Sequence, residues 1–190
     1  GVFGRKIGCA FVHREQRFPL AGAGVQPPQS RPVVILALAQ FETAIAGVPI
    51  GVRCKLVAEI SNNHNGDYDR CVRLIQAAHN AGADIIKFQA YTPTELVQLR
   101  GSGPAPDPWG ANGWTMEDLY AKAQTPLKWF PRLATYCAEH GIPWFSSVFG
   151  MGSLALLEAL DCPAYKLASL DYGKRALHRA VKATGKPVIQ

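Results

Sequence analysis

The sequence predicts a partial (β/α)8 barrel (TIM barrel) that contains the first four to five βα units, preceded by an N-terminal extension of unassigned structure. Three observations lead to this prediction. Short apolar stretches alternate with segments of helical periodicity, which is typical of a parallel sheet. The turn after the first stretch lacks the G-x-G-x-x-G pattern of an open dinucleotide-binding sheet. Charged and hydroxylated residues stand near the ends of the apolar stretches, where barrel enzymes place their active sites.

We expect two regions in the chain. Residues 1–54 alternate Gly/Pro-rich and basic pieces with one apolar segment and form the extension, in which spacing favours a helix over Val34–Ala46. Residues 55–190 form the N-terminal half of the barrel. The last five residues begin an apolar strand that stops at Gln190, so we expect the chain to be a fragment or an incomplete reading frame.

Each barrel element has a local reason in the sequence. Asp67 can cap a helix that Gly82 ends, and Pro126 can open a later helix that ends before Gly141. A long excursion rich in Gly, Pro and Trp separates the second expected strand from that later helix. The expected strands are 55–61, 84–90, 142–149, 164–169 and 186–190, and the expected helices are 67–81, 116–123, 126–140, 153–160 and 172–184.

Composition excludes several classes of protein. The 190 residues are 48% hydrophobic and 18% charged, as in a globular protein. The net charge of +6 comes from scattered basic residues with no nucleic-acid motif, so we expect no nucleic-acid partner. The apolar stretch 33–52 contains Glu42 and is a poor membrane span, so no membrane partner is expected. Five cysteines without C-x-x-C spacing suit a reducing cytoplasm.

Polar residues inside the apolar strands indicate a site. Side chains alternate along a strand, so Lys87 and Gln89 share the inward face of the second strand. Glu59 lies on the first strand and Lys166 on the fourth. Charged groups in such positions are costly unless they are paired or bound to a ligand. Two lysines near the hydroxyls of Ser146, Ser147 and Ser169 suit a phosphate or a carboxylate.

Two alternatives remain open at this point. Glu59 and a lysine could form an internal ion pair that merely fills the barrel. A buried lysine could also attack a carbonyl, as in a Schiff-base aldolase that handles phosphosugars.

Three stretches resemble the N-acetylneuraminate (sialic acid) synthase family, in the right order and spacing. They are Val57–Gly66, Ala81–Gln89 and Pro163–Ser169. Three further features resemble the pseudaminic acid synthase branch of that family more than the sialic acid branch: Tyr91-Thr-Pro93, Leu119–Pro126 with Trp129, and Ala168-Ser169.

The resemblance implies a condensation of phosphoenolpyruvate with a 2-acetamido or diacetamido aldose, giving a nonulosonic acid and phosphate. Glu59, Lys87 and Lys166 would be the catalytic residues, and the two lysines would hold the phosphate with Ser147 and Ser169. Gln89 would lie beside Glu59, and His64 and Asn65 would line the mouth of the site. Asp171 would bind the sugar.

The sequence also departs from the family pattern. Val148 stands where the family usually has proline, and Asp171 stands where it usually has the longer glutamate. The resemblance implies a divalent metal, Mn²⁺ or Mg²⁺, whose two histidine ligands belong to the second half of the barrel. We therefore expect no metal ligands in this chain, catalysis only by a complete protein that is a homodimer, and a fragment that is inactive alone.

Two of these site residues have simpler interpretations. His64 lies in a loop, where a histidine is often solvated or caps a turn. Asn65 precedes Gly66 and could be a turn former that tolerates left-handed geometry.

Overall fold

The computed structural model describes residues 44–51, 53–98 and 101–190 of the chain. Five parallel strands form one sheet in the order β3-β4-β5-β6-β7, so each strand pairs with the next along the chain. This order with helical crossovers confirms the partial (β/α)8 barrel. The strands are β3 (Val57–Glu59), β4 (Ile85–Ala90), β5 (Trp144–Val148), β6 (Tyr165–Lys166) and β7 (Val188–Ile189).

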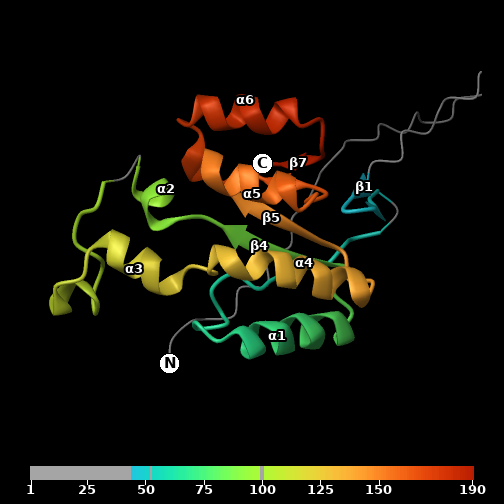
Figure 1. The fold of residues 1–190 in the computed structure, drawn as a ribbon, viewed down its shortest axis with the longest axis horizontal. Coiled ribbons are helices and arrows are strands. Elements are labelled where there is room, and N and C mark those ends of the chain that lie inside the picture. Colours follow the sequence, from blue (N-terminus) through green and yellow to red (C-terminus); the bar gives the residue numbers. More distant parts are fainter. Residues whose placement is uncertain (1–43, 52, 99–100) are drawn as a thin grey trace, which may run out of the picture.

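Four helices connect these strands and cover one face of the sheet. Figure 1 shows them in chain order from bottom to top. They are α1 (Tyr68–Asn80), α4 (Phe130–Glu139), α5 (Met151–Ala159) and α6 (Arg175–Ala183). The side chain of Asp67 accepts a hydrogen bond from the backbone N–H of Arg70, which confirms that Asp67 caps α1. The 3-10 turn η2 (Leu127–Trp129) leads into α4, and η3 (Ser169–Asp171) follows β6.

The main hydrophobic core lies between the sheet and these helices. Ile86 and Phe88 of β4 and Tyr165 of β6 contribute buried side chains from the sheet. The phenyl ring of Phe88 makes edge contacts with Phe130, at a centroid distance of 6.1 Å, and with Trp144 at 5.8 Å. The face of the sheet that does not contact the helices lines the interior of the barrel.

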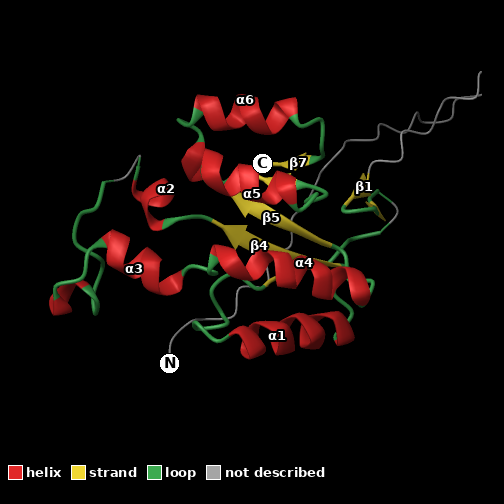
Figure 2. Ribbon diagram, viewed as in Figure 1, coloured by secondary structure: helices red, strands yellow, loops and turns green. Residues whose placement is uncertain are grey.

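The excursion after β4 is more structured than the sequence predicts. Figure 2 shows short helices in it, and they lie beyond the arrowhead of β4. They are α2 (Pro93–Val97), η1 (Gly110–Asn112) and α3 (Met116–Ala123). The sequence predicts α3 with these bounds but not α2, although Thr92 and Glu95 form a capping box around its first turn.

A β-hairpin precedes the barrel and consists of β1 (Ala44–Ile45) and β2 (Val48–Pro49). The expected helix over 34–46 lies largely outside the described residues, and at Ala44 and Ile45 the helix prediction is wrong. Ala46 and Gly47 both adopt positive φ, 51° and 74°, which suits a two-residue hairpin turn. Among the described residues, no helix is both long and apolar enough to cross a membrane.

Candidate active site

Glu59, Lys87 and Gln89 meet on the inner face of the sheet. Strand register places Glu59 of β3 directly beside Lys87 of β4. The ammonium group of Lys87 forms an ion pair with one carboxylate oxygen of Glu59. Gln89 donates a hydrogen bond of 3.1 Å from Nε2 to the other oxygen. The carboxylate of Glu59 is therefore held by two donors from the neighbouring strand.

A second row of polar side chains lies one step closer to the carboxyl ends of the strands. Register places Gln89 beside Ser147 of β5, and Ser147 beside Lys166 of β6. Residues in register on parallel strands point to the same face, so these three side chains share the inner face with Lys87. The structure thus places predicted polar residues of four strands, β3 to β6, on one inner face.

The surroundings of Lys166 favour an anionic ligand. Burial lowers the pKa of the Lys166 ammonium, and the positive charge of Lys87 lowers it further, whereas Glu59 and Asp171 act in the opposite direction. A bound anion would offset both unfavourable effects. In the described part of the barrel, the side chain of Glu59 is 26% exposed and that of Lys87 is 11% exposed. Both groups of the ion pair are thus accessible in this part of the barrel.

The opposite end of the inner face is apolar. Ile85, Phe145 and Ala164 form a buried cluster there, and Ile45 and Val48 of the hairpin pack against it. These three residues form an apolar floor below the polar rows, and the hairpin covers it. The charged residues therefore lie at the carboxyl ends of the strands, where barrel enzymes have their active sites.

Ser146 does not belong to the inner face. It stands in register with Phe88 and Tyr165, both of which face the helices. Its hydroxyl donates a hydrogen bond of 2.9 Å to the carbonyl oxygen of Ser147. Ser147 is the hydroxyl of this pair that faces the site.

Ser169 and Asp171 lie in the turn after β6. Ser169 is exposed at the start of η3. Asp171 is buried, and its Oδ1 forms an ion pair of 3.0 Å with Nζ of Lys174. In the described part of the chain its other oxygen, Oδ2, is buried and accepts no hydrogen bond. An unsatisfied buried acceptor is costly, which makes Oδ2 a candidate partner for a ligand donor.

His64 is fully buried, at 0% exposure. Its Nδ1 accepts a hydrogen bond of 2.9 Å from the backbone N–H of Gly66, so Nε2 carries the proton and donates to the Thr125 hydroxyl at 3.0 Å. That hydroxyl donates in turn to the carbonyl oxygen of Ser61. Both ring nitrogens are engaged, so the geometry favours the turn-capping interpretation over contact with a ligand.

Burial, followed by the positive charge of Arg70, lowers the pKa of His64 from its ordinary value of 6.5. As the pH drops below 6.5, this histidine is protonated more fully in the unfolded chain than in the folded one. The free energy of unfolding should therefore fall as the pH drops below 6.5. Replacing His64 with glutamine should remove this part of the pH dependence. Urea unfolding of both proteins between about pH 5 and 8 measures the difference, with the exposed His140→Gln as control. Parallel profiles for wild type and His64→Gln would contradict the assignment.

Asn65 serves the turn itself. Its backbone has φ +53°, its side chain is exposed, and its N–H bonds to the carbonyl of Asn62 at 3.1 Å. Asparagine tolerates this left-handed geometry better than most residues. Its role in substrate binding stays a prediction, as do the roles of the other predicted site residues.

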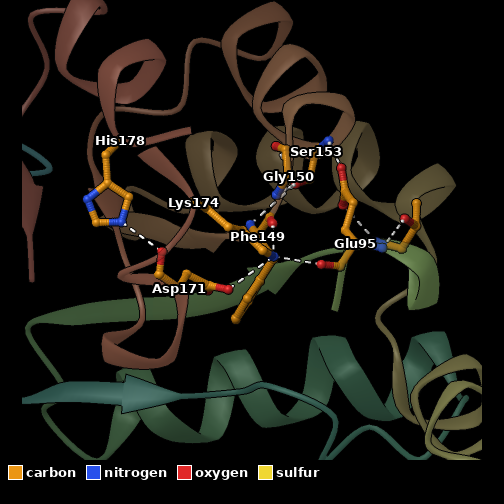
Figure 3. Close-up of polar contacts among 8 residues, drawn as sticks. Glu95, Phe149, Gly150, Ser153, Asp171, Lys174 and His178 are labelled. Carbon is orange, nitrogen blue, oxygen red and sulfur yellow. Dashed lines mark hydrogen bonds and ion pairs between the residues drawn. The ribbon is translucent and has the colours of Figure 1, made fainter. Parts of the chain in front are cut away.

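The sequence does not point to Glu95 and Lys174, which join the loops around the site. Figure 3 shows both among the residues after β4, β5 and β6. The T-x-x-E pattern of Thr92 to Glu95 could have indicated a capped helix. The i,i+3 pairing of Lys174 with Asp171 is local, whereas its other two partners lie 25 and 79 residues away along the chain, and no local pattern marks them.

The implied metal has no ligand set here. Within residues 44–51, 53–98 and 101–190, no three His, Cys, Asp or Glu side chains cluster as metal ligands would. His140 and His178 bond instead to backbone carbonyl groups. The described residues thus do not fit a metal centre.

Comparison with known proteins shows where the chain belongs. A sequence model of the NeuB family matches residues 74–190. The pseudaminic acid synthase of Helicobacter pylori is 37% identical over 140 residues, covering 71% of this chain and 40% of that protein. The spore coat polysaccharide biosynthesis protein SpsE of Bacillus subtilis is 30% identical over 152 residues, covering 80% of this chain and 40% of that protein.

Solved structures agree. The N-acetylneuraminic acid (sialic acid) synthetase of Leptospira borgpetersenii superposes with a TM-score of 0.58 at 27% identity, over 70% of this chain and 42% of that one. The chain thus spans about two fifths of the length of these relatives. The matches agree with the resemblance drawn from the strand-end motifs. The chain belongs to the NeuB family, whose members include pseudaminic and sialic acid synthases.

Proposed function

We propose that this chain supplies the phosphoenolpyruvate-binding part of a cytoplasmic nonulosonic acid synthase. The observation that carries the proposal is the convergence of Lys87 and Lys166 on one inner face, beside Ser147 and the Glu59 carboxylate. Two ammonium groups and a hydroxyl are complementary to a phosphate. The 37% identity to a pseudaminic acid synthase supports this choice among phosphate ligands.

The proposed reaction joins C3 of phosphoenolpyruvate to the aldehyde carbon of an open-chain 2-acetamido or diacetamido aldose. The aldehyde oxygen gains a proton, water adds at C2 and loses a proton, and the bond between C2 and the phosphate oxygen breaks. The products are a nonulosonic acid and phosphate. Lys87 and Lys166 bind the phosphate and stabilise its charge as it leaves.

Glu59 is placed for the proton transfers. Lys87 and Gln89 fix its carboxylate at the carboxyl end of β3. A fixed carboxylate can orient the attacking water and accept its proton. Asp171, with one oxygen without a hydrogen bond among the described residues, is proposed to bind a hydroxyl or amide of the sugar.

The domain division belongs to the same proposal. Residues 1–54 form an extension, residues 55–190 form the front half of the barrel, and the complete protein works as a homodimer. The described residues provide no metal-ligand cluster, so residues 1–190 alone are proposed to be inactive.

The test is to incubate the full-length protein with phosphoenolpyruvate, manganese and a panel of 2-acetamido and 2,4-diacetamido aldoses, and to follow phosphate release. Release that depends on one of these sugars supports the proposal, and matched 2-hydroxy aldoses serve as controls. No turnover with any acylated amino sugar contradicts it.

A Schiff-base aldolase is the second candidate, favoured by the lowered pKa of Lys166, which leaves more of the neutral amine for attack on a carbonyl. Borohydride treatment in the presence of substrate would then attach the substrate covalently to Lys166 or Lys87, as detected by mass spectrometry of the digested protein. The synthase predicts no such adduct.

A further inference from the structure

Lys174 connects three loops at the mouth of the candidate site. Its Nζ donates to the carbonyl oxygens of Glu95 and Phe149, each at 2.6 Å, and pairs with Oδ1 of Asp171 at 3.0 Å (Figure 3). Glu95 lies in the segment after β4, Phe149 follows β5, and Asp171 follows β6. The side chain of Lys174 is only 8% exposed, so its ammonium depends on these three acceptors.

The Glu95 carboxylate makes a second connection between the same loops. One of its oxygens accepts from the backbone N–H of Thr92 at 2.9 Å, and the other accepts from the N–H of Ser153 at 3.0 Å. It therefore caps α2 and α5 together, and negative charge is favourable at both helix N-termini. At Gly150, an added Cβ would lie 2.3 Å from this carboxylate, so the glycine leaves room for Glu95 in its present position.

These contacts lie next to the proposed sugar-binding acid. Asp171 is held by Lys174 through Oδ1, whereas Oδ2 is its oxygen without a hydrogen bond in the described structure. His178 also donates to the backbone carbonyl of Asp171, at 3.1 Å. The phosphate-binding lysines, in contrast, stand on the strands themselves, which hold their positions through the sheet ladder.

We propose that Lys174 is a positioning residue for sugar recognition. It holds the loops after β4, β5 and β6 in one arrangement and fixes the position of Asp171, whose buried Oδ2 lacks a hydrogen bond in the described structure, for recognition of the acylated amino sugar. The inference rests on the proposed synthase function. The positions of the three loops would then depend on a residue outside the strands. Sugar binding and phosphoenolpyruvate binding would depend on different residues.

The test compares Lys174→Met with wild type in the full-length protein. Methionine keeps the packing of the stem but removes the charge and the three donors. With the sugar that wild type accepts, kcat/KM for that sugar should fall about 10–100-fold, as is typical when a supporting contact is lost. KM for phosphoenolpyruvate should stay at the wild-type value. In Lys174→Ala, ethylammonium added to the buffer should restore part of the lost sugar kcat/KM.

Hydrogen exchange on the same proteins provides a readout that needs no turnover. Lys174→Met should speed exchange in residues 91–98, 149–154 and 169–174 together, and leave α1 and α4 unchanged. The exposed Lys182→Met on α6 is the matched control and should behave as wild type.

The outcomes are distinguishable. If wild type releases no phosphate with any acylated amino sugar, the proposed function fails, and the exchange pattern alone decides whether Lys174 holds the loops. If Lys174→Met matches Lys182→Met in exchange and in sugar kcat/KM, the positioning role is overturned. It is also overturned if the variant loses kcat at unchanged KM values and exchange speeds up equally in α1, α4 and the three loops, because that pattern indicates a general loss of stability.

Discussion

Replacing Lys166 with methionine is expected to lower kcat/KM for phosphoenolpyruvate by about 10²–10³-fold in the full-length protein, the usual cost of removing one preorganised partner of a developing charge. Lys166 shares the inner face with Lys87 and Ser147, and the positive charge of Lys87 acts on its ammonium. Methionine has similar length and no charge, so the loss would report the ammonium group. Steady-state kinetics at saturating sugar provide the measurement.

The pH dependence supplies a second readout of the same residue. Burial and Lys87 lower the pKa of Lys166, so its ammonium loses its proton at a lower pH than an ordinary lysine does. Affinity for the phosphate should therefore weaken as pH rises through this lowered pKa, and the Lys166→Met variant should lack that step. The exposed Lys122→Met on α3 should keep wild-type kinetics and pH profile. A Lys166→Met variant with unchanged kcat/KM would remove Lys166 from the phosphate site.

Replacing Phe88 with alanine is expected to lower the free energy of unfolding by about 3–5 kcal/mol, the range for truncating a buried phenylalanine. Phe88 is 1% exposed on β4, and its ring packs edge-on against Phe130 of α4 and Trp144 of β5. The substitution would leave a cavity between the sheet and α4 and remove both aromatic contacts. Urea unfolding of the chain, followed by circular dichroism, measures the change.

The exposed Leu56, at 45%, is the matched control for this experiment. Leu56→Ala should change the free energy of unfolding by no more than about 0.5 kcal/mol. A loss of less than about 1 kcal/mol in Phe88→Ala would contradict the core assignment, because truncating a buried phenylalanine costs more than that.

The barrel could be predicted from the sequence because local sequence patterns indicate its strands and helices. Asp67 caps α1 as its position before an apolar periodic segment predicts, and α3 has the expected bounds. The alternation along β4 also places Lys87 and Gln89 on one face, and the contacts of both with Glu59 agree with that placement.

The remaining features depend on contacts that are distant in sequence. Ala44 and Ile45 form a hairpin strand because Ile45 packs on the apolar floor built by Ile85, Phe145 and Ala164. His64 is buried because Thr125 and Trp129, more than 60 residues away, pack against its ring. No local pattern in the sequence marks these partners.

An isotope label tests the proposed synthase reaction by following the bridging oxygen of phosphoenolpyruvate. The full-length protein is incubated with substrate labelled with ¹⁸O between C2 and phosphorus, together with the sugar that supports turnover. The synthase reaction breaks the bond between C2 and that oxygen, so the label should appear in the released phosphate. Label retained in the sugar-acid product, or absence of phosphate release, would contradict the account.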